Sequence, residues 1–256
     1  MPDGRFVAGG RLALTTFTVA PLPTGRVDRA TAGTAMALAP MVGALLGLLL
    51  AALLGGLAAL APPLVAGGVT VAAAALLTRG LHLDGLADTV DALGSYRSGP
   101  AALQIMRQPE VGPFGVAALV LVLLIQAGCL AALALRPWPA LLTAVVTVVA
   151  TGRLAVTWAC RRGVPAARPD GLGALVAGTV GPGTLAVATV AVALAALPAV
   201  PGRPWQGVLA VAAALAGTLL VLRHAVRRLG GITGDVLGAA VEIATTLCCL
   251  GLVLTG

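Results

Sequence analysis

The chain consists of long apolar runs of Ala, Leu and Val, separated by short segments that contain Pro, Gly and Arg. A helix needs about 20 residues to cross the hydrocarbon core of a membrane, and most of these runs approach or exceed that length. Membrane β-strands would instead alternate apolar and polar residues. The pattern therefore predicts membrane-spanning helices, at 33–60, 64–80, 114–135, 138–160, 173–198, 206–222 and 236–255.

Proline and glycine divide these runs. Pro62-Pro63 separates the first two, and Gly181-Pro182-Gly183 interrupts the fifth, where a broken helix is one interpretation. A shorter apolar stretch at 12–20 ends in Pro21-Leu22-Pro23 and is predicted to be an interfacial or re-entrant segment.

Composition supports this assignment: 59% of the 256 residues are hydrophobic and only 10% are charged. We therefore expect an all-α, polytopic bundle of about seven spans, with 1–256 as one integral membrane domain surrounded by lipid. The net charge of +7 would suggest nucleic acid in a soluble protein. Here the arginines flank apolar runs, so no nucleic-acid partner is expected. The four Cys lie in or beside apolar runs and are expected to be buried thiols.

The arginines also predict orientation, because cytoplasmic loops carry an excess of basic residues. A cytoplasmic N-terminus leaves only Arg136 and Arg203 on the far side, and Arg153 inside a span. We expect an inner-membrane protein with the segment 79–113 and the active site on the cytoplasmic side. The arginines on that side are then Arg5, Arg11, Arg26, Arg29, Arg79, Arg97, Arg107, Arg161, Arg162, Arg168, Arg223, Arg227 and Arg228.

Three carboxylates are spaced for one helix face. Asp84, Asp88 and Asp91 stand at i, i+4 and i+7, which form a single stripe. Such carboxylates repel one another unless a cation neutralises them, and oxygen ligands suit Mg²⁺ or Mn²⁺. Mg²⁺ completes its shell with water and phosphate, so the stripe predicts a metal-bound phosphate substrate. A solvated acidic face is the alternative, but three of only nine acidic residues in the chain fall here.

Several neighbours are candidate substrate contacts. Arg79 and Arg107 are candidate phosphate ligands, and Arg107 could equally be a positive-inside anchor. Gly112 permits close backbone approach. His82 lies roughly 200° from Asp84 around a helix, and is either a hydrogen-bond donor to phosphate or an interfacial histidine.

A second polar cluster lies before the last span. Gly231 and Gly234 belong to a glycine-bearing turn, and Thr233 can cap the helix that follows it. Backbone N–H groups at such a turn can bind an anion. Asp235 and Glu242 are seven residues apart on one face, with Glu242 roughly 10 Å deeper. The turn is therefore a second candidate wall of the site.

Arg153 is expected within the fourth span. It could pair with Glu242 or Asp235, bind substrate phosphate, or extend to the cytoplasmic surface. The cost of exposing a guanidinium to lipid favours a position facing the bundle.

These motifs carry a family resemblance. Arg79-Gly-Leu-His-Leu-Asp-Gly-Leu-Ala-Asp-Thr-Val-Asp91 resembles the signature of cobalamin synthases, the adenosylcobinamide-GDP ribazoletransferase family. The stretches 105–115 and 230–242 are similar to its second and C-terminal motifs. The chain departs from the family pattern at Ala92, at 107–110 and in the looser N-terminal motif at 15–23.

The resemblance implies a reaction and its partners. The hydroxyl of α-ribazole, or of its 5′-phosphate, attacks the cobinamide-side phosphorus of adenosylcobinamide-GDP, and GMP leaves. Mg²⁺ is the expected metal, held by Asp84, Asp88 and Asp91. Asp235 is a candidate general base, although a metal-bound Asp could equally take the proton. Self-association and pathway partners are left open.

Two other functions fit parts of the pattern. Other metal-dependent membrane alcohol phosphotransferases also use Asp-rich motifs, but their longer Gly- and Asp-containing run is lacking here. A transporter could use Asp84, Glu242 and Arg153 as an ion path. Transporter sites lie near the midplane of the membrane, whereas these clusters are predicted at its boundary.

Overall fold

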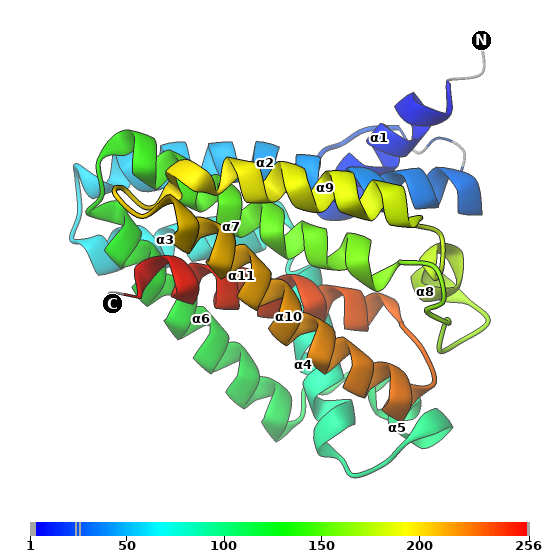
Figure 1. Cartoon of the computed structure of the whole chain (residues 1–256). Coiled ribbons are helices and arrows are strands. Elements are labelled where there is room, and N and C mark those ends of the chain that lie inside the picture. Colours follow the sequence, from blue (N-terminus) through cyan, green and yellow to red (C-terminus); the bar gives the residue numbers. More distant parts are fainter. Residues whose placement is uncertain (1–3, 24, 26, 255–256) are drawn as a thin grey trace.

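The computed structural model describes residues 4–23, 25 and 27–254 and is built from helices (Figure 1). Eleven α-helices and one 3₁₀ helix are described over this part of the chain. They are α1 (Arg5–Phe17), α2 (Arg29–Ala58), α3 (Pro63–Leu77), α4 (Leu81–Gly94), α5 (Gly99–Ile105), α6 (Pro113–Ala134), α7 (Trp138–Ala159), α8 (Gly171–Val176), α9 (Pro182–Ala195), η1 (Leu197–Ala199), α10 (Pro204–Leu229) and α11 (Gly234–Val253).

Six of these helices are long and apolar enough to cross a membrane: α2, α6, α7, α9 with η1, α10 and α11. They coincide with six of the seven predicted runs. The run predicted at 64–80 is α3, which has 15 residues and passes the same criterion only together with α4. The two helices are bent by 91° at their junction, so the bundle has six spans, or seven if this pair counts as one.

Three predicted segments have different boundaries. The run expected at 173–198 starts as a long helix only at Pro182, because Gly181 is an extended N-cap and Pro182 occupies the first turn. The run expected to end at 222 continues to Leu229, where Gly230 adopts φ +86° and terminates the helix. The stretch at 12–20 lies mostly in α1, which packs against α2.

α7 is the central helix of the bundle. In its most apolar stretch of 18 residues, 83% of the residues are buried, compared with 17% in α6. It packs between α2 and α11. A Cβ on Gly43 would lie 2.8 Å from the carbonyl oxygen of Val149, and one on Gly47 would lie 2.8 Å from the Cα of Val146. Small residues thus let α2 and α7 approach closely, as membrane helices without a strong hydrophobic drive require.

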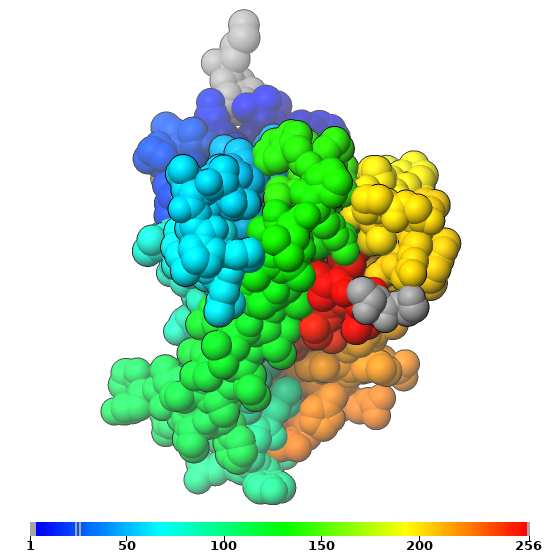
Figure 2. Space-filling model, turned by 90° about the vertical axis from the view of Figure 1, so that its left-hand side faces the viewer, coloured from blue at the N-terminus to red at the C-terminus, as the bar shows by residue number. Residues whose placement is uncertain are grey.

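The two ends of the bundle differ. One end gathers α1, α5, α8 and the C-terminus of α10 (Figure 1). Figure 2 shows the other end, where the α2–α3, α6–α7 and α9–α10 connections lie near the C-terminal end of α11. There Arg136 donates to the carbonyl oxygens of Ala199 and Leu252, at 2.8 and 2.5 Å.

The cysteines are inside the protein, as the sequence predicts. All four are free and buried: Cys129, Cys160, Cys248 and Cys249.

Candidate functional site

The bend between α3 and α4 sets the direction of the Asp-bearing helix. Arg79 and Gly80 both adopt left-handed conformations, with φ of 57° and 66°. Gly80 does so without strain, whereas Arg79 carries a Cβ. The Arg79 guanidinium donates to the carbonyl oxygen of Thr15 at 3.2 Å, which ties the bend to α1. The structure therefore places Arg79 at the junction and not beside the carboxylates of α4.

α4 crosses α11 at close range. A Cβ on Gly85 would lie 2.6 Å from the carbonyl oxygen of Asp235 and 3.1 Å from the Cα of Gly238. A Cβ on Gly238 would in turn lie 3.2 Å from the Cα of His82. This contact brings the two polar clusters of the sequence together, although about 150 residues separate them along the chain.

Three carboxylates meet at this crossing. Asp84 is exposed in the first turn of α4, Asp88 is half-buried one turn later, and Asp235 begins α11. α4 lies outside the six long apolar helices. Burial raises the pKa of Asp88 to about 6, and the negative charges of Asp84, Asp235 and Asp91 add to the effect, while Arg168 opposes it. Such mutual repulsion is typical of carboxylates grouped to hold a cation.

Asp91 differs from the other two members of the stripe. It is only 8% exposed, and its two oxygens accept hydrogen bonds from the backbone N–H groups of Gly112 at 2.8 Å and Gly115 at 2.9 Å. These N–H groups belong to the first turn of α6 and would otherwise lack a helical partner. Asp91 thus caps α6 from another helix and fixes the end of the loop at 106–112.

Two clefts flank the carboxylates. The loop cleft, about 400 Å³, lies between the C-terminal half of α4 and the loop before α6, and is lined by Asp88, Asp91 and Gly112. The turn cleft, about 330 Å³, lies on the α11 side and is lined by Thr233, Gly234 and Asp235. Asp88 of the loop cleft and Asp235 of the turn cleft are close enough for the charge of Asp235 to raise the pKa of Asp88, so the two clefts lie on either side of the α4–α11 crossing.

Arginines line the turn cleft. Arg107 points into it and lies 3.9 Å from the carboxylate of Asp170, with both side chains well exposed. Arg168 also lines it and donates to the carbonyl oxygen of Leu103 at 3.0 Å. Its Nε is buried without a hydrogen-bond partner among the described residues. From the sequence, Arg168 was predicted only as a basic residue of the cytoplasmic side; the local signal for a further role is the Pro169-Asp170 pair that follows it before a glycine.

The glycine-bearing turn has a defined structure. Gly231 packs against the backbone of Ala166 and Ala167, where no Cβ would fit. Thr233 caps α11: its hydroxyl oxygen accepts from the N–H of Val236 at 3.2 Å and donates to the Asp235 carboxylate at 3.2 Å. The predicted cap is confirmed, and the same hydroxyl holds one oxygen of Asp235.

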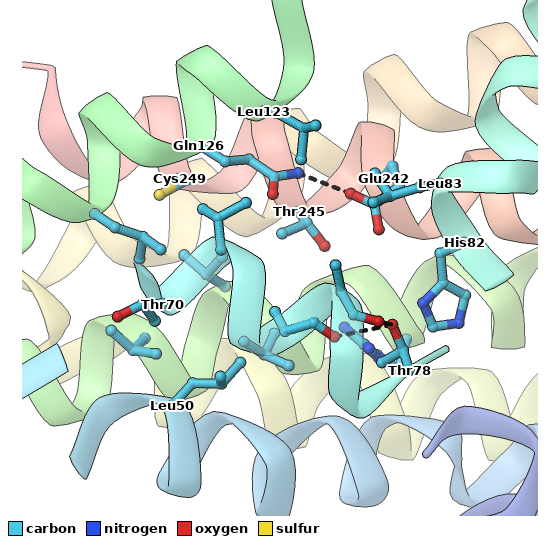
Figure 3. A pocket seen from close by; sticks show the side chains of 18 residues that line it. Leu50, Thr70, Thr78, His82, Leu83, Leu123, Gln126, Glu242, Thr245 and Cys249 are labelled. Atoms are coloured by element: carbon cyan, nitrogen blue, oxygen red, sulfur yellow. Dashed lines mark hydrogen bonds between the residues drawn. The ribbon is translucent and has the colours of Figure 1, made fainter. Parts of the chain in front are cut away.

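The other predicted residues face an inner cavity of about 50 Å³ inside the bundle. Figure 3 shows Gln126, Thr245 and Glu242 on one side and His82 on another. Gln126 donates to the Glu242 carboxylate at 2.8 Å. Arg153 is 5% exposed and its charge acts on Glu242. Within the described part of the chain, His82 Nε2 and Arg153 Nε have no hydrogen-bond partner.

The inner cavity is therefore separate from the carboxylate face of α4. His82 lies on the opposite side of that helix from the Asp stripe, as its spacing predicts, and its ring stacks on Phe17 at 6.1 Å. A volume of this size accommodates a few water molecules at most. His82, Arg153 and Glu242 are thus brought together, but behind the candidate site.

The donor set can be compared with what Mg²⁺ requires. Among residues 4–23, 25 and 27–254, no three His, Cys, Asp or Glu side chains form a ready metal-binding group. Mg²⁺ does not need one, because it commonly binds one or two carboxylates and completes its shell with water and phosphate. Asp84 and Asp88 fit this kind of site, because they lie one helical turn apart and their negative charges repel each other.

The fold and the site together define an integral membrane protein of six to seven helical spans, with grouped carboxylates and arginines at one end of the bundle. A family model described as CobS, cobalamin-5-phosphate synthase, matches residues 9–253. The chain belongs to this family, as its motifs indicate.

Curated relatives carry one name. A protein of Frankia casuarinae named adenosylcobinamide-GDP ribazoletransferase is 42% identical over 96% of this chain and 94% of its own. Proteins of the same name from a Nocardioides species and from Geotalea daltonii are 44% and 36% identical, over 91% and 96% of this chain and 93% and 96% of their own. No solved structure matches the chain.

Proposed function

We propose that this chain is an adenosylcobinamide-GDP ribazoletransferase of the inner membrane. It joins adenosylcobinamide-GDP to α-ribazole, or to its 5′-phosphate, and releases GMP in the assembly of cobalamin. Family membership and the shared name of the relatives support the activity. The observation that carries the proposal is the α4–α11 crossing, where Gly85 lets Asp84 and Asp88 meet Asp235 beside two arginines.

The substrate diphosphate is proposed to bind along the turn cleft. Arg107 and Arg168 line it and supply planar donors that match phosphate oxygens. Gly231, Thr233 and Gly234 form the opposite wall, at the N-terminus of α11, where the helix dipole favours an anion. Gly112 and the loop cleft receive the part of the substrate beyond the phosphates.

Asp235 is proposed as the base that takes the proton of the attacking hydroxyl. Its hydrogen bond from Thr233 and its position in the first turn of α11 hold it at the crossing. An ionised Asp84 or Asp88 is the alternative base in the same place. The phosphorus is then attacked from the side opposite to the departing GMP, whose charge the arginines stabilise.

Mg²⁺ is the proposed metal, and Asp84 and Asp88 would hold it. Asp91 was predicted as a third ligand, but both of its oxygens accept backbone hydrogen bonds, so we propose that it positions α4 instead. When bound, the ion supplies charge neutralisation for the diphosphate and the leaving phosphate.

Arg79, His82, Arg153 and Glu242 were also predicted to contact the substrate. Their positions at the α3–α4 bend and around the inner cavity make an indirect role the simpler proposal. We propose that they hold the back of α4 in place.

The basic end of the bundle is proposed to face the cytoplasm. It carries the arginines of α1, of the segments on either side of α5, of the segment before α8 and of the C-terminus of α10, whereas Arg136 lies at the other end. The N-terminus and the active site are then cytoplasmic.

The test is GMP release by the purified, detergent-solubilised protein given adenosylcobinamide-GDP, α-ribazole and Mg²⁺, with and without EDTA. The expected result is one GMP per cobalamin formed, abolished by EDTA and restored by excess Mg²⁺. A folded, monodisperse protein without turnover would contradict the proposed activity.

The metal assignment has its own test. Asp84→Ala is expected to lose turnover while it inserts into the membrane and elutes as the wild type does. Retained turnover in this variant would overturn the role of Asp84.

A further inference from the structure

Three arginines outside the candidate site line one cleft. Arg161 lies two residues after the end of α7, and Arg223 and Arg227 stand one turn apart on the same face of α10. The cleft they border, called the basic cleft here, has a volume of about 230 Å³. It is lined by the C-terminal turns of α10, and this end of α10 lies beside α5 (Figure 1).

The charge in the basic cleft is not balanced by acidic side chains. Within the part of the chain that the structure describes, no Asp or Glu lines it. Burial lowers the pKa of Arg161, and the charge of Arg223 lowers it further. Like charges one turn apart also destabilise α10. An anion in the cleft would relieve the repulsion between these three guanidinium groups.

The chemistry of the lining narrows the kind of anion. Arg161 already donates one N–H to the carbonyl oxygen of Trp158 at 2.9 Å, which fixes its guanidinium at the rim. Guanidinium groups bind the oxygens of a phosphate in pairs. Val164, Leu222 and Val226 form the apolar part of the wall. A phosphate group attached to an organic group therefore fits the cleft: the phosphate would bind at the charged rim, and the organic group would contact the apolar wall.

The basic cleft is distinct from the turn cleft but shares a wall with it. Ile232 lines both clefts. Its N–H donates to the carbonyl oxygen of Pro165 at 2.9 Å, and its own carbonyl accepts from Ala167 at 3.0 Å. Asp235 and Thr233 lie on one side of this bridged segment, and the three arginines lie on the other.

We propose that Arg161, Arg223 and Arg227 bind a phosphate ester group in the basic cleft. Two sources share this chemistry: the headgroup of an anionic membrane lipid at the cytoplasmic boundary, and a soluble phosphate monoester. Occupation of the cleft stabilises the 160–168 connection and, through Ile232, the turn that carries Asp235. The site stands independently of the reaction, because it is built from residues outside the carboxylate crossing.

The experiment measures thermal unfolding of the purified protein in a neutral detergent. The additives are short-chain phosphatidylglycerol, short-chain phosphatidylcholine, glycerol 3-phosphate and inorganic phosphate at matched concentrations and ionic strength. A ligand that binds only the folded state raises the unfolding midpoint. Stabilisation by phosphatidylglycerol alone identifies a lipid headgroup, and equal stabilisation by glycerol 3-phosphate identifies a soluble phosphate ester. Equal midpoints with all four additives overturn the proposal.

Variants assign the effect to the cleft. Arg223→Gln with Arg227→Gln is expected to weaken binding of the effective additive by about tenfold or more, as for lost charge-assisted hydrogen bonds. The control, Arg5→Gln with Arg162→Gln, removes the same charge from two exposed arginines at the same end that do not line the cleft. Equal weakening in both double variants would show a general charge effect and overturn the site.

A conservative double variant distinguishes lost binding from misfolding. Arg223→Lys with Arg227→Lys keeps the charge but not the paired donors. It is expected to unfold near the wild-type midpoint without additive and to bind the additive less tightly. Wild-type binding by this pair would also contradict the proposed bidentate contacts.

Discussion

The Asp91 carboxylate accepts a hydrogen bond from the N–H of Gly115 at 2.9 Å, 24 residues away. The same carboxylate accepts from Gly112, so one buried side chain joins the end of the Asp stripe to the start of α6. The helix that carries the carboxylates is therefore tied to the loop that lines one of their clefts.

Asp91→Asn is expected to lower the free energy of unfolding by about 1–3 kcal/mol, the cost of a buried N–H without a partner. The amide has one acceptor oxygen where the carboxylate has two, so either Gly112 or Gly115 loses its bond. Chemical unfolding in detergent measures this. Glu110→Gln, an exposed carboxylate in the neighbouring loop, should change stability far less. Equal effects would mean that Asp91 is not a cap.

Gly85→Ala is expected to destabilise the protein by about 1–3 kcal/mol and to abolish most of the turnover, since the added Cβ meets the backbone of α11. Backbone atoms cannot rotate away as a side chain can, so α4 must shift from Asp235. Gly128→Ala is the control, because a Cβ there meets nothing within 4 Å and lies mid-helix in α6. Thermal midpoints and GMP release distinguish the two.

The affinity for Mg²⁺ is expected to fall as the pH is lowered from about 8 to about 5. The pKa of Asp88 is raised to about 6, so its protonated form accumulates below that pH, and a proton then competes with the ion. Above about pH 6 the affinity should level off; below it the loss should approach about tenfold per pH unit. Titration of the metal by calorimetry measures this. The Asp88→Asn variant should bind more weakly and without this dependence, and identical pH profiles would refute the assignment.

Glu242→Gln is expected to destabilise the bundle by about 1–3 kcal/mol, because it leaves the buried Arg153 charge without its counter-charge. Combining it with Arg153→Met should recover part of that loss, as removal of both charges usually does. Thermal midpoints of the two single variants and the double variant give the coupling. If both single variants keep the wild-type midpoint but raise KM, the residues contact substrate directly, as first predicted.

Arg168→Lys is expected to raise KM for adenosylcobinamide-GDP with little change in the unfolding midpoint. Lysine keeps the positive charge in the turn cleft but loses the planar pair of donors. Steady-state GMP release measures the effect. Unchanged KM would remove Arg168 from the site.

Much of this architecture follows from the sequence. Hydropathy alone predicted the six long helices, because a membrane-spanning helix must be apolar over its whole length. The i, i+4, i+7 spacing separated His82 from the Asp stripe, and the Thr233 cap followed from the residue before α11. These features depend on neighbours within a few turns of the same helix.

Features that depend on distant segments were not predictable in this way. The capping role of Asp91 requires knowing that the loop at 106–112 folds back on α4. Arg168 resembles any other boundary arginine until the turn cleft is assembled. The 91° bend between α3 and α4 depends on two consecutive left-handed residues, Arg79 and Gly80. The sequence suggests this conformation for Gly80 but not for Arg79.

The buried, unpaired cysteines have a practical consequence. A membrane-impermeant maleimide reagent should leave the native chain unlabelled, since Cys129, Cys160, Cys248 and Cys249 are all shielded inside the protein. A single cysteine introduced at an exposed tip, such as Tyr96→Cys at one end or Leu60→Cys at the other, then becomes a unique reporter. Labelling of intact spheroplasts against opened ones would read the sidedness of each end directly, without first removing the natural thiols.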